Sequence, residues 1–341
     1  MKPEFQIDPL DHADDFRSAL RRWFLRHGRE LPWRRTQDPY AILVSEVMLQ
    51  QTQIATVLGK GYYVRFLERF PDLASLAAAD DRSLLKAWEG LGYYRRARML
   101  RETARAVIER HEGSFPHQLD ELMALPGIGR YTAGALRAFA FGLPAVVVDG
   151  NVSRVLARIM DFADPVDQTA AIRQLWGWAE ILADPEHPRE HHAAMMELGQ
   201  THCRPGVPDC LACPVSRFCC AQNPAALPAK KNKSSITEIE EHALWVRGAD
   251  QHLLLHHESG PRRTGFWKLP LREASALSGH PIISQSQYPI TRYRVSLHVH
   301  HAQLQDAIAR PREGDSWVAD NDLPDLPLAA TYKPVILALI E

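Results

Sequence analysis

All five cysteines of the 341-residue chain lie between residues 203 and 220, in the stretch HCRPGVPDCLACPVSRFCC. Four follow the spacing Cys203-x6-Cys210-x2-Cys213-x5-Cys219, and Cys220 is left over. Secreted domains distribute cysteines so that disulfides join distant segments, whereas four thiols this close in sequence suit one metal ion or cluster. Thiolate ligands serve zinc and iron–sulfur clusters equally well, so the spacing leaves both open.

A glutamate stands inside an apolar helical pattern, as Glu46 of YAILVSEVMLQQTQ. Three and four residues away on a helix lie Ile42, Leu43, Leu49 and Gln50. Burial disfavours the charged form of a carboxyl and raises its pKa, as a general acid near neutral pH requires. The alternative is a partly exposed glutamate paired with an arginine.

An aspartate, Asp149, closes the apolar run VVV and precedes the helical pattern GNVSRVLAR. Aspartate at a helix start is a common N-cap. A capping carboxylate is also fixed in place and ionised, so it could face a developing positive charge. The two roles are compatible.

The stretch from Leu122 to Gly142 predicts a helix, a tight turn and a second helix. Gly127 and Gly129 allow positive φ and leave backbone N–H groups uncovered before the second helix, an arrangement that binds phosphate. Small residues, Gly134 among them, predict that the two helices pack closely against each other. A purely structural hairpin is the alternative.

An arginine face is expected after GLGYY, where Arg95, Arg98 and Arg101 recur at three-residue intervals. Beside it, Tyr93 and Tyr94 could stack on or wedge between bases, which favours DNA binding. The alternative is a solvated helix face.

The elements that must position these residues change character along the chain. Apolar residues spaced three and four apart predict helices over 12–200, and a Pro-, Ala- and Lys-rich stretch predicts a linker. Short apolar runs, then a terminal helix, predict a smaller β-rich second domain. These runs are 243–246, 253–255 and 295–299, with the helix at 334–340.

Composition, with 45% hydrophobic and 24% charged residues, indicates a folded, soluble protein. The formal net charge of −1 gives no sign of a nucleic-acid partner, so any basic surface must be local. We expect a cytoplasmic protein without membrane contact, because neither a signal-peptide core nor roughly 20 consecutive apolar residues occur.

Together these motifs resemble the MutY adenine DNA glycosylases, a branch of the helix-hairpin-helix superfamily that includes endonuclease III. LPWRRTQDPYAILVSEVMLQQTQ, GLGYYRRAR, LPGIGRYTAG, VDGNV, MMELG and the cysteine loop occur in the family's order, over nearly the whole chain. The resemblance implies an α+β protein of two domains. Its parts are a glycosylase domain over 1–222, with the hairpin at about 119–141 and the cluster loop at 203–219, a linker over 223–236, and a MutT-like domain over 237–341.

The resemblance also implies a 4Fe-4S cluster on Cys203, Cys210, Cys213 and Cys219, with Cys220 as a spare. It implies that Glu46 is the acid that protonates adenine. It also implies that Asp149 is the carboxylate that stabilises the oxocarbenium-like sugar, and that Asn151 assists Asp149. The implied substrate is double-stranded DNA with adenine opposite 8-oxoguanine or guanine. The adenine nucleotide is flipped out of the duplex.

Further residues are assigned by the same resemblance. The adenine pocket would comprise Arg29, Trp33, Leu49, Ile54 and Glu197, and the opposite strand and oxidised base would be probed by Gln51, Leu91 and Tyr93. Endonuclease III-like enzymes carry a nucleophilic lysine where this chain has Tyr131, and tyrosine cannot form the Schiff base that leads to strand cutting. We therefore expect a monofunctional, monomeric bacterial enzyme, the alternatives being a glycosylase with lyase activity and a noncatalytic DNA-binding protein.

The second domain resembles the MutT-like domain that recognises 8-oxoguanine, for example in TGFWKLP. The acidic metal-binding signature of Nudix hydrolases is absent, so no pyrophosphatase activity is expected. Where the family usually has a Phe-Ser-His-like loop, this chain has Ile290-Thr291-Arg292-Tyr293. Thr291 preserves the hydroxyl, while Arg292 replaces the histidine.

Overall fold

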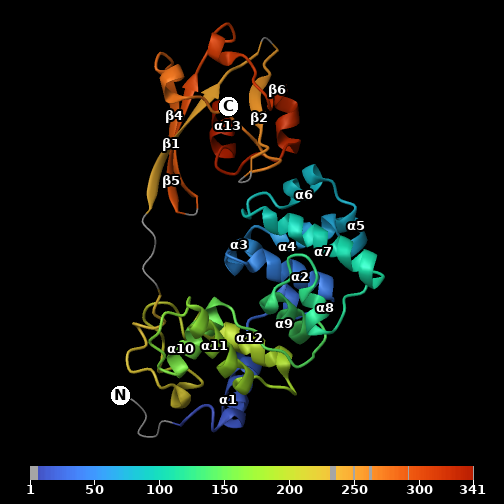
Figure 1. Cartoon of the computed structure of the whole chain (residues 1–341), viewed down its shortest axis with the longest axis vertical. Helices are drawn as coiled ribbons and strands as arrows, with labels where there is room; N and C mark the ends of the chain where they lie inside the picture. The colour runs from blue at the N-terminus through green and yellow to red at the C-terminus, as the bar shows by residue number, and fades with distance from the viewer. Residues whose placement is uncertain (1–6, 231–235, 249, 261–262, 291, 341) are drawn as a thin grey trace. The chain divides into compact units, whose positions relative to one another are not determined.

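Among the residues that the structure describes, the first two thirds are helical and every strand lies after residue 236, as the sequence predicted for an α+β protein (Figure 1). The computed structural model describes residues 7–230, 236–248, 250–260, 263–290 and 292–340. Over these residues, none of the helices combines the length and the apolar character needed to cross a bilayer.

Contacts between Cα atoms divide the chain into two units. Unit 1 contains Met1–Gln53, Asp72–Ala74 and Glu102–Asn232; unit 2 contains Ile54–Pro71, Ser75–Arg101 and Lys233–Glu341. Two helical segments, Ile54–Pro71 and Ser75–Arg101, therefore group with the strand-rich C-terminal part. The domain limits expected from the sequence stay a prediction, because contact grouping and independent folding are different properties.

Unit 1 is built from helices that pack around buried apolar clusters. Its helices are α1 (Ala13–His27), α2 (Pro39–Leu49), α8 (Leu119–Met123), α9 (Arg130–Phe139), α10 (Gly150–Ile159), α11 (Thr169–Leu182) and α12 (Pro188–Thr201), with 3₁₀ helices η1 (Pro32–Arg34) and η2 (Ser216–Phe218). In α10, buried Val152, Val155, Leu156 and Ile159 recur at helical spacing and join Phe16 of α1. This shared core fixes where the start of α10 lies.

The helix α2 is buried along almost its whole length. Asp38 caps it, with its carboxylate accepting from the backbone N–H groups of Tyr40 at 3.0 Å and Ala41 at 3.2 Å, and Pro39 occupies the first turn. The cap fixes the helix start, so Glu46 is carried into the interior of unit 1.

The hairpin of α8 and α9 forms as predicted, with one difference in its turn. Gly127 adopts a φ of 76°, which favours glycine, but Gly129 is extended, with φ −95° and ψ 177°, and serves as N-cap of α9. Of the two glycines that allow positive φ, only Gly127 adopts it. Gly134 has a packing role, since a Cβ there would lie far inside contact distance of the Val146 carbonyl oxygen.

Unit 2 combines helices with two three-stranded sheets. In one sheet β5 lies between a parallel β1 and an antiparallel β4, and in the other β2 lies between antiparallel β3 and β6. The elements are α3 (Ile54–Gly59), α4 (Tyr62–Arg69), α6 (Asp81–Ala87), β1 (Thr237–Trp245), β2 (Leu253–His257), β3 (Trp267–Lys268), β4 (Ile282–Ile290), β5 (Tyr293–His301), β6 (Asp315–Val318) and α13 (Lys333–Ile340), with 3₁₀ helices η3 (Ala274–Leu277), η4 (Ala307–Ala309) and η5 (Asp320–Asp325). Both α5 (Leu73–Ala77) and α7 (Arg95–His111) have residues in each unit.

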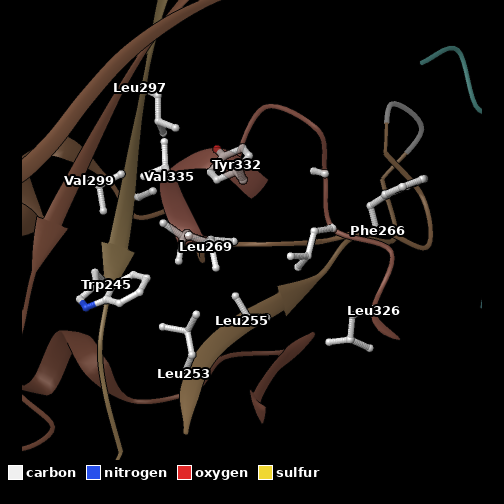
Figure 2. Close-up of a cluster of buried hydrophobic side chains, with 14 of the residues drawn as sticks. Trp245, Leu253, Leu255, Phe266, Leu269, Leu297, Val299, Leu326, Tyr332 and Val335 are labelled. Atoms are coloured by element: carbon white, nitrogen blue, oxygen red, sulfur yellow. The ribbon is translucent and has the colours of Figure 1, made fainter. Parts of the chain in front are cut away.

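The core of unit 2 lies between the two sheets and α13 (Figure 2). Trp245 of β1, Leu255 of β2 and Leu297 of β5 point into it together with Tyr332. The predicted apolar runs thus became strands, and the predicted terminal helix became α13. Leu85 of α6 joins the same cluster, which explains the grouping of that helix with unit 2.

Candidate active site

The Glu46 carboxyl is buried in α2, with the residue only 6% exposed. Burial, opposed by a hydrogen bond from Tyr131 and assisted by the nearby charge of Asp149, raises the pKa of Glu46 to about 7. The predicted burial and pKa shift of Glu46 are confirmed. The group can therefore hold and release a proton near neutral pH.

Tyr131, at the start of α9, donates its hydroxyl hydrogen to Glu46 Oε2 at 2.6 Å. Burial raises the pKa of Tyr131 well above its usual value, so its hydroxyl stays a donor. The sequence indicated only that Tyr131 is not a lysine. The structure adds that its hydroxyl orients the Glu46 carboxyl.

Asp149 is the N-cap of α10, as predicted, with its Oδ1 accepting from Val152 N at 2.7 Å. Its other oxygen, Oδ2, accepts from Asn151 Nδ2 at 2.8 Å. Both carboxylate oxygens are held, so this side chain is fixed in the same region as Glu46.

Arg154 extends this network toward the cysteine loop. Its Nη2 donates to Asn151 Oδ1 at 2.9 Å and to the Gly199 carbonyl at 2.7 Å, and its Nε donates to the Cys203 carbonyl at 2.8 Å. A Cβ on Gly199 would lie 2.8 Å from Asn151 Cβ. The glycine of MMELG thus lets α12 approach the residue that holds Asp149.

A second buried carboxylate, Glu197 of α12, forms ion pairs with two arginines. Arg29 Nε donates to its Oε1 at 2.5 Å, and Arg34 Nη2 donates to its Oε2 at 2.8 Å. Burial alone would raise the pKa of Glu197, but these bonds outweigh it and lower that pKa. Arg34, like Gln200, which accepts from Arg29, was missed by the sequence analysis. The repeated arginines of LPWRR were the only available signal for Arg34.

The other residues expected in the adenine pocket belong to both units. Trp33 is buried in η1 of unit 1, and Leu49 is half-buried at the end of α2. Gln51 is exposed, with a left-handed φ of 60° that is unusual for a non-glycine residue. Ile54 starts α3 and belongs to unit 2.

The GLGYY segment, in unit 2, presents one tyrosine to solvent. Tyr93 is 56% exposed at a left-handed φ of 48°, while Leu91 is buried. Arg96 lies over the Tyr93 ring at 5.5 Å and donates to the carbonyls of Leu91 and Gly92 at 3.0 and 3.2 Å. A bulky residue held at positive φ is a mark of functional sites.

Arg95 is exposed, but Arg98, Arg101 and Tyr94 do not form the expected DNA-facing surface. Tyr94 packs on Phe266, with ring centroids 3.9 Å apart. Arg101 is buried and pairs with Asp81 at 2.7 Å, and Arg98 donates to the Thr264 carbonyl at 2.6 Å. The expectation was wrong for these three side chains, because unit 2 uses them for its own packing.

Thr291 lies outside the described residues. Its neighbour Arg292 is exposed and donates to the Tyr293 hydroxyl at 3.0 Å.

None of the five cysteines forms a disulfide. Burial raises the pKa of the Cys213 thiol to about 12 and that of Cys219 to about 11, and neighbouring thiols, Cys203 among them, add to both rises. The donor types suit zinc or an iron–sulfur cluster. Within the described ranges, however, no three His, Cys, Asp or Glu side chains are gathered as a group that could hold a metal ion.

The cysteine loop is anchored by protein contacts. Buried Arg158 donates to Cys203 Sγ at 3.4 Å, to the Arg204 carbonyl at 2.7 Å and to the Gly206 carbonyl at 2.9 Å. Phe218 packs edge-on against Phe16 in the unit 1 core. The loop is thus packed against the core of unit 1.

Comparison with known proteins gives a consistent result. The family model described as HhH-GPD superfamily base excision DNA repair protein matches residues 44–180. The chain is 43% identical over 238 residues to the Homo sapiens protein named adenine DNA glycosylase, covering 66% of this chain and 43% of that protein. It is 32% identical over 257 residues to the protein of the same name from Buchnera aphidicola subsp. Baizongia pistaciae, covering 74% of this chain and 71% of that protein.

Two solved structures share the helical part of the fold. A thermostable thymine-DNA glycosylase matches with a TM-score of 0.57 and 29% identity, over 62% of this chain and 98% of that one. Endonuclease III trapped in a covalent intermediate with DNA matches with a TM-score of 0.53 and 26% identity, over 62% of this chain and 95% of that one.

Proposed function

The chain belongs to the adenine DNA glycosylase family of the HhH-GPD superfamily, and on that premise we propose that it hydrolyses the bond between adenine and deoxyribose in duplex DNA. The observation that carries this proposal is Glu46, a buried carboxyl with a pKa of about 7, in the same region as the fixed carboxyl of Asp149. Two carboxyls in such different environments suit an acid and a charge stabiliser.

In the proposed reaction, Glu46 gives its proton to the leaving adenine as the bond between N9 and C1′ breaks, and the bonding electron pair leaves with the base. Asp149, held by Asn151, faces the positive charge that develops on the sugar. Water then adds to C1′ and returns a proton to Glu46. The products are free adenine and an abasic site.

We propose that the reaction ends there, without strand cutting. Tyr131 occupies the place of the lysine in lyases, and its hydroxyl is engaged with Glu46. A phenol cannot form a Schiff base with the sugar.

For substrate recognition, we propose that the flipped adenine is bound by Arg29, Trp33, Leu49, Ile54 and Glu197. The hydrogen bond from Arg29 to the buried Glu197 carboxylate supports a polar wall of this pocket that can accept hydrogen bonds. Arg34 is added to this set.

The duplex would be held and probed by other residues. Gln51, Leu91 and Tyr93 would read the opposite strand, where the left-handed backbones of Gln51 and Tyr93 support a wedge role. Gly127 and Gly129 would bind phosphate. The base opposite adenine is proposed to be 8-oxoguanine or guanine, with Thr291 contacting the oxidised base.

A 4Fe-4S cluster is proposed on Cys203, Cys210, Cys213 and Cys219, because four thiols are the right donors and the family resemblance implies this group. When bound, it would supply a structural crosslink for the loop. We further propose that the enzyme acts as a monomer in the bacterial cytoplasm.

One assay tests the function directly. The full chain is incubated with duplexes bearing adenine opposite 8-oxoguanine, guanine or thymine, and strand breakage is compared with and without alkali. We expect alkali-dependent breakage at adenine, fastest opposite 8-oxoguanine. Breakage without alkali, or a covalent complex trapped by borohydride, would contradict the monofunctional mechanism, and no adenine release from any duplex would contradict the function.

A further inference from the structure

A basic hollow of about 890 Å³ lies in unit 2, and none of the residues assigned to chemistry above lines it. Six of its side chains are basic and two are acidic. The basic ones are Lys60, Arg65, Arg69, Arg82, Lys86 and Lys333, and the acidic ones are Glu89 and Asp325. The molecule as a whole is nearly neutral, so this concentration of positive charge is local.

The acidic side chains leave most of this charge uncompensated. Glu89 is shared between Lys86 at 3.0 Å and Lys333 at 2.6 Å. Arg82 reaches only the backbone carbonyl of Asp325, at 3.2 Å. No carboxylate of a described residue forms an ion pair with Arg82, nor with the three basic residues from α3–α4, which are Lys60, Arg65 and Arg69.

The cations at the α4 wall are held in place by aromatic rings. Arg65 lies over the ring of buried Tyr62 at 5.3 Å and donates to the Lys60 carbonyl, and Arg69 lies over Phe70 at 5.7 Å. Stacked guanidinium groups keep their N–H donors available for a ligand at a low entropic cost. The hollow is thus preorganised to bind an anion.

We infer that this hollow binds phosphate groups. Guanidinium forks match phosphate oxygens, and the hollow is within the size range of ligand sites, so it can take a ligand with several phosphates. That chemistry is shared by free polyphosphates, nucleoside triphosphates included, and by the backbone of a DNA strand. The inference does not depend on the proposed glycosylase activity.

The test uses the full chain and inorganic tripolyphosphate, with binding measured by calorimetry at low salt. The double variant Lys60→Ala/Arg69→Ala removes two exposed cations that form no ion pair with a described residue, and we expect affinity to fall about tenfold or more. The matched control is Arg110→Ala/Arg173→Ala, which removes two exposed cations from unit 1 and should bind as the unaltered chain does. Equal melting temperatures of the two double variants exclude unfolding as the cause.

A competition arm identifies the source of the phosphate. If an undamaged duplex displaces tripolyphosphate, and the pocket variant loses duplex affinity while the control does not, the ligand is the DNA backbone. If tripolyphosphate binding persists beside bound duplex, the ligand is a free polyphosphate. Absence of tripolyphosphate binding, or equal weakening in both double variants, would overturn the inference.

Discussion

At the residue scale, the proposed chemistry depends on Glu46 being both buried and hydrogen-bonded. Burial raises the pKa of Glu46 to about 7, so the folded protein binds its proton more tightly than the unfolded chain does. The stability that this proton contributes is present at acidic pH and is lost as pH rises through about 7. Function and stability are therefore linked in one side chain.

Glu46→Gln should abolish acid catalysis and also change the pH dependence of stability. The amide keeps the shape but donates no acidic proton, so adenine release should fall by about 100-fold or more while duplex binding persists. The melting temperature of the variant should exceed that of the unaltered chain at pH 8.5 more than at pH 5.5. Glu180→Gln, on the exposed side of α11, is the control. A near-unaltered release rate would remove Glu46 from the acid role.

Tyr131→Phe should move the pH profile of adenine release. The hydrogen bond that Tyr131 donates lowers the pKa of Glu46, so losing it raises that pKa further. Glu46 then stays protonated to higher pH, and the alkaline fall in the single-turnover rate should shift upward. An unchanged or downward-shifted profile would show that this hydrogen bond does not tune Glu46.

At the element scale, close approaches set the position of the Glu46 and Asp149 carboxyls, which we propose are catalytic. The α9 helix carries Tyr131 and packs on α2, which carries Glu46. Gly134 of α9 lies against the Val146 carbonyl, three residues before Asp149. One glycine thereby fixes the distance between α9 and the strand-like segment that leads to the cap of α10.

Gly134→Ala should destabilise the protein and slow adenine release together. The new Cβ would collide with the Val146 carbonyl, and overpacking of this kind costs about 1–3 kcal/mol. Gly177→Ala in α11 is the matched control. A Cβ at Gly177 would meet no heavy atom of the described residues within 4 Å beyond its own helix backbone and chain neighbours, so the helix preference of alanine should stabilise the protein by about 0.5–1 kcal/mol. Thermal melts and single-turnover rates measure both effects, and equal melting temperatures would contradict the packing role.

At the scale of the whole molecule, each unit takes residues from distant parts of the sequence. The cysteine loop joins unit 1 through Phe218 and Arg158, and α6 joins the core of unit 2 through Leu85. Because Arg154 links the Cys203 carbonyl to Asn151, a disturbed loop should also affect the site.

Cys210→Ser should lower the iron content of purified protein, its melting temperature and its duplex affinity, because loss of one ligand removes the crosslink of the loop. Cys220→Ser, its close neighbour in sequence, should leave all three nearly unchanged. The measurements are iron per chain, thermal melts and duplex titration. A colourless, fully active protein with one zinc per chain would contradict the iron–sulfur proposal and leave the Glu46 chemistry intact.

The sequence by itself determined the features that depend on local order and residue type. The apolar neighbours of Glu46 predicted its burial and raised pKa, the place of Asp149 before a helix predicted its cap, and alternating runs after residue 236 predicted strands. Each follows from the periodicity of a single element, which the sequence shows directly.

Only the tertiary structure decided which side chains meet across elements. The hydrogen bonds from Tyr131 to Glu46 and from Arg34 to Glu197 have no local signature in the sequence, because the partners are 85 and 163 residues apart. The same reason explains the wrong expectation for Arg101, whose partner Asp81 lies on another helix. Periodicity tells which face of a helix is buried or charged, but the partner of that face is set by how the chain packs in three dimensions.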